Sequence, residues 1–161
     1  MRLPDLTLNV AQLLREDVGA TRSHQFPAAE SLRDCNVQLL RVPQGLLVST
    51  EALLEHEPEC SRCLRPFVKR EQLEFEDPYY EGKPENDAEA FLVSNAQTID
   101  ITEGLRQYFM TAVSMQPLCK NDCPGICPVC GKDLQEAPCD CDSQPKDSRW
   151  QALAALRIDE G

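Results

Sequence analysis

The chain has 161 residues, of which 42% are hydrophobic and 27% charged, a composition typical of one globular domain or of one domain with a small appendage. Its formal net charge of −11 makes it a poor generic nucleic-acid binder, because contacts with phosphate supply most of the affinity for nucleic acids. No apolar run reaches the roughly 20 residues of a membrane span, and the segment from Met1 to Leu6 lacks the apolar core of a signal peptide. We therefore expect a cytoplasmic protein without membrane association.

Alternating apolar and polar residues predict a mostly antiparallel sheet in the first half of the chain. A short strand is expected at residues 6–10, followed by about two helical turns from Ala11 to Asp17 and another strand around Phe26. A hairpin is expected at residues 37–48, because Pro43-Gln-Gly45 is a typical turn sequence.

The alternation returns at residues 52–59 and 68–75, on either side of Cys60-Ser-Arg-Cys63. This C-x-x-C is therefore placed at the turn between two strands. The following stretch, residues 74–89, holds seven acidic residues and one base, together with Pro and Gly. We interpret this composition as a solvated acidic linker near 76–90, with a partner-binding loop as the alternative.

Beyond Ile99 the apolar period changes from two to that of a helix. Asp100 with Glu103 is typical of a capping box, and Pro117 ends the helix. One stripe of this helix is apolar and is expected to pack on the sheet: Ile101, Leu105, Tyr108, Phe109, Ala112 and Val113. A last short helix is expected at Arg149–Arg157, capped by Asp147 or Ser148.

These elements predict an α+β fold, in which a mostly antiparallel sheet is packed by one long amphipathic helix and followed by a C-terminal segment resembling a zinc ribbon. The expected domains are residues 1–115, which include the C-x-x-C turn and the acidic linker, and residues 116–161, which include the cysteine-rich tail and the final helix.

The cysteines give the strongest chemical signal. Six of the nine lie between residues 119 and 141, and two more form the C-x-x-C. In a reducing compartment, clustered cysteines at such short gaps are typical of tetrahedral Zn²⁺ sites rather than of disulfides. A redox-active Cys60–Cys63 pair is the other alternative, but it needs a following helix, and Pro66 with a strand-like pattern stands there instead.

The economical assignment is two structural Zn²⁺ ions. One site uses Cys127, Cys130, Cys139 and Cys141; the other uses Cys60, Cys63, Cys119 and Cys123. A single mixed site with spare thiols remains the alternative. Four thiolates leave no open position on the metal, so neither site is expected to be catalytic.

The remaining candidate groups are weaker. Cys35 is expected to be a small buried residue, and His56 a surface or core histidine rather than a ligand; His24 has no partner in sequence. Residues 60–70 contain no acid and four bases, which form either a solvated face or a contact patch for RNA or a partner. These bases are Arg62, Arg65, Lys69 and Arg70.

With these motifs assembled, the sequence resembles the YceD family, the bacterial large ribosomal RNA subunit accumulation proteins. The resemblance rests on Glu59–Phe67, which is similar to the family's C-x-R-C-L-x-P-F block, and on Ile99–Glu103, which resembles its helix start. Pro117–Cys141 resembles the cysteine tail of the longer members, and Asp147–Trp150 resembles the segment before their final helix. Gln135 departs from the family pattern, which usually has Asn after the leucine.

The resemblance implies a cytosolic, non-enzymatic ribosome-biogenesis factor that supports accumulation or processing of large-subunit (23S) ribosomal RNA. Its expected partner is pre-ribosomal RNA or a ribosomal protein, with no small-molecule substrate. An acidic chaperone or adaptor for a basic ribosomal protein is the second hypothesis. A thiol-redox or zinc-dependent enzyme is the third.

Overall fold

The computed structural model describes residues 2–84 and 90–141. The chain divides into two compact units. The first unit takes Met1–Pro58 and Phe67–Pro117, and the second takes Glu59–Pro66 and Leu118–Gly161. The expected helix at 149–157 lies outside the described residues.

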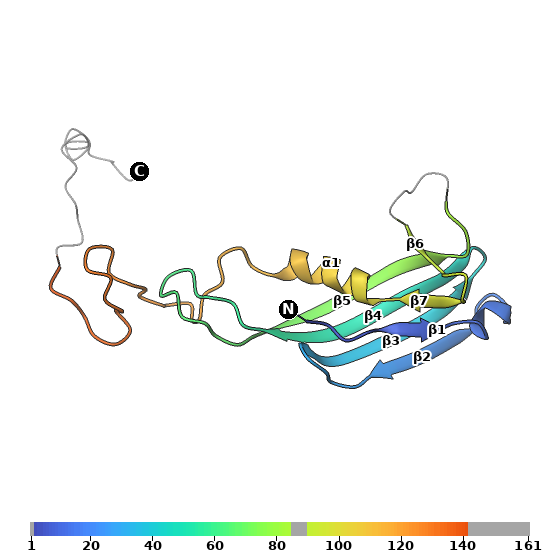
Figure 1. Ribbon diagram of the computed structural model, residues 1–161, viewed down its shortest axis with the longest axis horizontal. Helices are drawn as coiled ribbons and strands as arrows, with labels where there is room; N and C mark the ends of the chain where they lie inside the picture. The colour runs from blue at the N-terminus through green and yellow to red at the C-terminus, as the bar shows by residue number, and fades with distance from the viewer. Residues whose placement is uncertain (1, 85–89, 142–161) are drawn as a thin grey trace, which may run out of the picture. The chain divides into compact units, whose positions relative to one another are not determined.

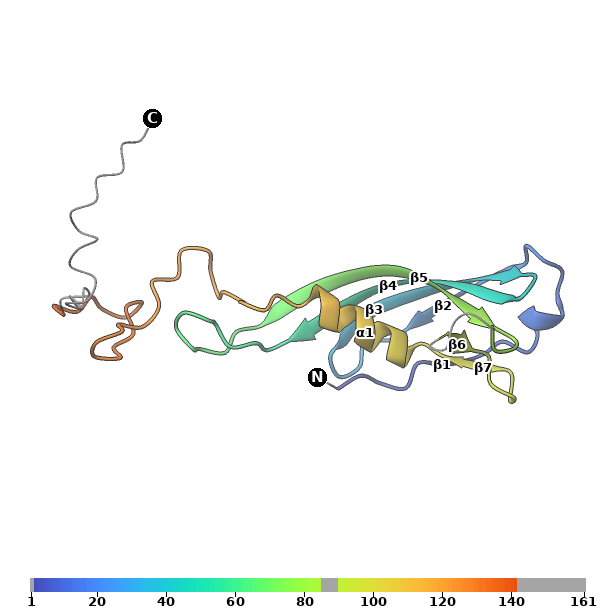
Figure 2. The ribbon, with the colours of Figure 1, turned by 90° about the horizontal axis from the view of Figure 1, so that it is seen from above.

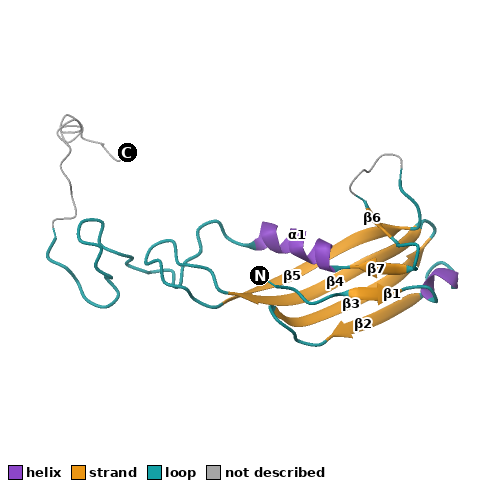
Figure 3. Ribbon diagram, in the orientation of Figure 1, coloured by secondary structure: helices purple, strands orange, loops and turns teal. Residues whose placement is uncertain are grey.

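The first unit is built on a five-stranded sheet in the order β2-β3-β4-β5-β6 (Figures 1 and 3). Its strands are antiparallel except for the β5–β6 pair. A separate antiparallel pair joins β1 to β7. The strand bounds are β1 Thr7–Asn9, β2 Thr21–Phe26, β3 Leu32–Val42, β4 Gly45–His56, β5 Lys69–Tyr80, β6 Phe91–Leu92 and β7 Thr98–Asp100.

One helix, α1 (Thr102–Ala112), lies along one face of this sheet (Figure 2). It has 11 residues, so it is shorter than the long helix that the sequence suggested. Leu105 and Phe109 are buried in the core, and Tyr108 stacks on Phe75 of β5 with ring centroids 4.1 Å apart. The α+β class with a mostly antiparallel sheet and one packed helix is confirmed.

Only part of the predicted capping box forms at the start of α1. The Asp100 carboxylate accepts a hydrogen bond from the Thr102 amide at 2.8 Å. The Glu103 side chain instead lies 3.6 Å from Arg106, one turn further along the helix.

Two local predictions were wrong. The helix expected at 11–17 is only a three-residue 3-10 helix, η1 (Leu13–Arg15), and it buries a single side chain, Leu13. The stretch 76–80, expected in an acidic linker, is the end of β5. Side chains in this stretch alternate between the two faces of a strand. Glu76 is exposed, whereas Asp77 accepts a hydrogen bond from Tyr108 of α1 and Tyr79 is buried. The acidic composition therefore belongs to a strand and not to a linker. Residues 85–89 lie outside the described part.

The β3–β4 hairpin depends on Gly45, which has a φ of +151°. A Cβ at this position would lie 1.9 Å from the Tyr79 carbonyl oxygen. Glycine therefore allows β4 and β5 to pair up to the end of the hairpin. The C-x-x-C falls between the end of β4 and the start of β5, as predicted. No helix in the described residues is long and apolar enough to cross a membrane.

Candidate metal centres

The first C-x-x-C forms a tight knuckle within the second unit. The Leu64 amide donates to the Cys60 carbonyl at 2.8 Å, and the Cys60 amide donates to the Arg65 carbonyl at 2.9 Å. Leu64 has a φ of +60°, in the left-handed region that non-glycine residues rarely adopt. Amide N–H groups of the knuckle, chiefly that of Cys63, lower the pKa of the Cys60 thiol to about 6.

The second C-x-x-C repeats this geometry. The Gly131 amide donates to the Cys127 carbonyl at 2.9 Å, and Gly131 has a φ of +72°, at the position that Leu64 holds in the first knuckle. The Val129 amide points at the Cys127 sulfur at 3.4 Å. Amides of Cys130 and Val129 lower the pKa of the Cys127 thiol to about 6.

The two knuckles are completed by the remaining cysteines of the cluster. In each of two groups of four, the sulfur atoms lie within 4.8 Å of one another. The groups are Cys60, Cys63, Cys119 and Cys123, hereafter site one, and Cys127, Cys130, Cys139 and Cys141, hereafter site two. The structure thus brings together the two sets that the spacing suggested.

Sulfur–sulfur distances in site one fit a tetrahedral ion. Cys60 Sγ lies 3.8 Å from Cys123 Sγ, and Cys63 Sγ lies 3.8 Å from Cys119 Sγ. A tetrahedron with metal–sulfur bonds of about 2.3 Å has edges of about 3.8 Å, whereas a disulfide is about 2.05 Å long. All nine cysteines are free thiols.

The thiols within each group differ in pKa. In site one, burial raises the pKa of the Cys123 thiol to about 12, opposite to the shift of Cys60. In site two, hydrogen bonding to Cys130 raises the pKa of the Cys141 thiol to about 12. Each group therefore combines one thiol of lowered pKa with two of raised pKa, which are Cys119 and Cys123 in site one and Cys139 and Cys141 in site two. A cation bound between the four sulfurs would favour the thiolate form of all of them.

No apolar side chain other than cysteine is buried in the described part of the second unit; its buried side chains are those of Cys60, Cys63, Cys123 and Cys127. A unit of this kind lacks the hydrophobic core that normally stabilises a domain. The two thiol groups are thus the structural centre of the described part of the second unit, and within each group the sulfurs lie close enough together to hold a metal ion.

All four bases of the candidate contact patch have hydrogen-bonding partners. Arg62 donates to the Cys123 carbonyl at 2.9 Å. Arg65 pairs with Asp133 and Glu136, each at 2.6 Å. In the first unit, Lys69 pairs with Glu71 at 2.8 Å and Arg70 with Glu55 at 2.9 Å. The stretch 60–70 has no acid of its own, but in the fold Arg65 and Arg70 pair with acids from other parts of the chain. Lys69 pairs with the neighbouring Glu71, and Arg62 donates to a backbone carbonyl.

Cys35 and His56 are part of the first unit, and neither belongs to a thiol group. Cys35 is fully buried in the core, as predicted, and burial raises its pKa to about 11. His56 lies 3.4 Å from Glu71 and packs edge-on against Phe109, with centroids 5.0 Å apart.

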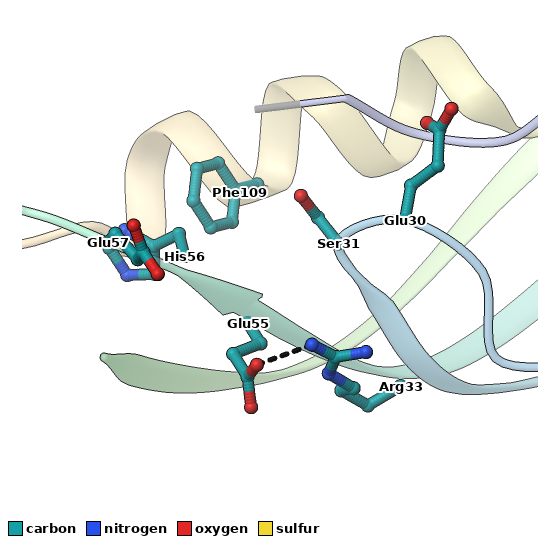
Figure 4. Close-up of a pocket in the computed structure, with 7 residues that line it drawn as sticks. All are labelled: Glu30, Ser31, Arg33, Glu55, His56, Glu57 and Phe109. Carbon is teal, nitrogen blue, oxygen red and sulfur yellow. Dashed lines mark hydrogen bonds and ion pairs between the residues drawn. The ribbon is translucent and has the colours of Figure 1, made fainter.

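A hollow of about 500 Å³ lies beside His56 in the first unit (Figure 4). Arg33, the one Lys or Arg side chain in its lining, pairs with Glu55 at 2.5 Å, and the ion pair is drawn in Figure 4. Among the described residues, only the two thiol groups have the spacing of a metal site. The hollow is lined by Glu30, Ser31, Arg33, Glu55, His56, Glu57 and Phe109.

One residue was missed by sequence reasoning. The Gln135 side-chain amide donates to Cys123 Sγ at 3.4 Å and to Cys119 Sγ at 3.7 Å. It lies in a short polar loop without periodicity, so no sequence signal marked it as a neighbour of site one.

The family described as "Large ribosomal RNA subunit accumulation protein YceD" matches residues 48–157, a span that contains both knuckles and all eight clustered cysteines. The chain belongs to the YceD family. This confirms the resemblance drawn from the cysteine motifs.

Relatives of this YceD chain include uncharacterised proteins of Mycobacterium bovis and Mycobacterium tuberculosis, each 29% identical over 130 residues. The match covers 78% of this chain and 62% of each relative, so the chain spans less than two thirds of their length. The chloroplastic "Large ribosomal RNA subunit accumulation protein YCED homolog 1" of Arabidopsis thaliana is 32% identical over 59 residues, which is 37% of this chain and 18% of that protein. No solved structure matches.

Proposed function

We propose that this protein is a non-enzymatic, cytoplasmic ribosome-biogenesis factor that supports accumulation of large-subunit ribosomal RNA, with two structural Zn²⁺ ions in its second unit. The observation that carries the proposal is the family match, which includes the two knuckles. The name of the Arabidopsis relative supports the same role.

Zinc is the metal that this donor set favours. Four cysteine sulfurs at tetrahedral separations are typical of structural Zn²⁺ sites in reducing compartments. Elemental analysis of protein purified without added metal is expected to give about two equivalents. Cys127→Ser with Cys139→Ser is expected to leave one, and Cys35→Ser, which lies outside both sites, is expected to leave two. A chain without bound metal would contradict this part of the proposal.

Bound zinc would make the chain more acidic. Each site adds two negative charges, because four thiolates surround one Zn²⁺, so two sites take the formal charge from −11 to about −15. Contact with RNA must therefore be local. We place it at Lys69 and Arg70 at the start of β5, whose side chains are 35% and 64% exposed and project from opposite faces of the strand.

The structure changes how this patch should be tested. Reversing the charge of Arg65 would place a carboxylate between Asp133 and Glu136 and would disturb the second unit itself. Lys69→Gln with Arg70→Gln removes charge from the first unit only. Arg22→Gln is the matched control, since Arg22 is a paired surface base on another strand.

The second hypothesis, an adaptor for a basic ribosomal protein, is favoured by the net charge. Sucrose-gradient sedimentation of lysate, with and without nuclease, separates the two. Direct RNA contact predicts that the protein moves with ribosomal precursors, and that nuclease or the Lys69/Arg70 pair of substitutions releases it while Arg22→Gln does not. An adaptor would stay with its basic partner after nuclease. A protein that never enters precursor fractions would contradict both.

A further inference from the structure

A short loop connects the two metal sites. Residues 132–136 lie in sequence between Cys130 and Cys139, two thiols of site two. The side chain of Gln135 nevertheless reaches site one, with Nε2 at 3.4 Å from Cys123 Sγ and 3.7 Å from Cys119 Sγ. A side chain from the loop of one site thus donates hydrogen bonds to the sulfurs of the other.

The loop is held in this position by several bonds. The backbone N–H of Gln135 donates to one oxygen of the Asp133 carboxylate at 2.8 Å. The other oxygen of that carboxylate pairs with Arg65 at 2.6 Å. The Leu134 amide donates to the Gly125 carbonyl at 3.0 Å. The loop is therefore tied both to the knuckle of site one and to the turn after Cys123.

The packing leaves little freedom at that turn. Gly125 has a φ of +79°, and a Cβ there would lie 3.0 Å from the Arg62 carbonyl oxygen. The Ile126 amide donates to the same carbonyl at 3.1 Å. The first knuckle, the 123–126 turn and the 132–136 loop thus form one hydrogen-bonded layer.

We propose that Gln135 is a positioning residue that couples the two sites. Metal at site two fixes the 132–136 loop, and the loop then holds the side-chain amide of Gln135 within hydrogen-bonding distance of the thiolates of site one. The inference rests on the proposed metal binding and adds that the two ions bind cooperatively. Amide donors to a ligand sulfur offset its negative charge, and loss of such a donor typically lowers metal affinity 10–100-fold. Coupling is reciprocal, so site one equally stabilises site two.

The test is a double-mutant cycle on the full-length chain, using zinc and a chromogenic chelator as the probe. Its two perturbations are Gln135→Leu and loss of site two through Cys127→Ser with Cys139→Ser. Each alone is expected to weaken site one by about 10–100-fold. Together they are expected to weaken site one no more than loss of site two alone, because the donor is already lost. Gln38→Leu, on the exposed side of β3, is the control and leaves affinity unchanged.

Cobalt-substituted protein gives a spectroscopic readout that would not change if Gln135 only stabilised the fold. Removing the amide donor from a sulfur ligand is expected to shift the thiolate-to-cobalt charge-transfer band of site one in Gln135→Leu, with tetrahedral coordination retained. Circular dichroism of the sheet verifies that the variant folds.

The outcomes are distinguishable. If Gln135→Leu binds zinc at site one as tightly as the parent, or if loss of site two weakens site one equally with and without Gln135, the coupling is overturned while the zinc proposal stands. A chain that binds no metal overturns the zinc proposal and this inference together.

Discussion

Removing the proposed zinc ions from the chain is expected to unfold the second unit and to leave the sheet of the first unit in place. The perturbation is a strong chelator at neutral pH under reducing conditions. The prediction depends on the side chains that each unit buries. The core cluster belongs entirely to the first unit, and between residues 59–66 and 118–141 the second unit buries only cysteine side chains.

The magnitudes favour complete loss of order in the second unit. Ordering one residue costs about 1–2 kcal/mol of backbone entropy, whereas a hydrogen bond returns about 0.5–1.5 kcal/mol net. The ion pairs of Arg65, whose side chain is 46% exposed, add about 0–1 kcal/mol each. Structural zinc typically contributes about 10–16 kcal/mol per site, so the two proposed ions would be the largest favourable contribution to the order of the second unit.

Hydrogen exchange followed by mass spectrometry is the suitable assay, because it reports on each segment separately. Peptides from 59–66 and 118–141 are expected to lose protection within seconds of chelation, while peptides from β3 and β4 keep theirs. Chelator already saturated with zinc is the control. Persistent protection of 118–141 in metal-free protein would refute the reasoning, and so would simultaneous loss of protection in β3 and β4.

Four further predictions concern single positions and pH. Gly104→Ala in α1 is expected to stabilise the first unit by about 0.5–1 kcal/mol, since its Cβ would meet neighbours no closer than 3.5 Å. Gly45→Ala is expected to destabilise the first unit by about 3 kcal/mol or more, because its Cβ would collide with a backbone carbonyl of β5. Urea unfolding measures the stability of both alanine variants, and equal changes in the two would contradict this reasoning. Leu64→Gly is expected to slow exchange at 59–66, because a left-handed leucine costs roughly 1–2 kcal/mol more than glycine; faster exchange would show that the leucine side chain itself stabilises the knuckle. Burial raises the pKa of Cys35 to about 11, and a hydrogen bond to a carboxylate raises that of Tyr108. Both pKa values are raised by folding, so the stability they contribute is complete below the ordinary values of about 8.5 and 10 and is lost as pH rises through the folded values. Urea midpoints should fall above about pH 10, and Tyr108→Phe should reduce that fall.

The fold was largely predictable because its strands alternate clearly. The register places Val37 and Leu39 on the buried face of β3, and the same two-residue period was visible in the sequence. The end of β5 was not predictable, because Pro78 and the neighbouring acids have the composition of a linker. Here β5 is next to a strand of only two residues, so the missing amide of Pro78 leaves the rest of the sheet intact.

The thiol groups were predictable from spacing, because a C-x-x-C knuckle supplies two ligands and a four-coordinate ion requires two more. The side chains that surround the thiol groups were not predictable from the sequence. The partners of Arg65 lie about 70 residues further along the chain, and ion pairs at such a separation have no local signal. Gln135 was hidden for the same reason: its partners, Cys119 and Cys123, are defined by the fold.

The separation of the ligands along the chain also sets an order for metal binding. Site two is local, since its thiols all lie between residues 127 and 141, whereas site one joins Cys60 to Cys123 across 63 residues. Loop closure costs about 0.6 kcal/mol for each doubling of loop length, so in the unfolded chain site one is the more expensive to form by about 1–2 kcal/mol. Metal should therefore enter site two first and fix the 132–136 loop. Site one would then close with its Gln135 donor already in position, although the coupling free energy between the two sites is the same whichever of them fills first.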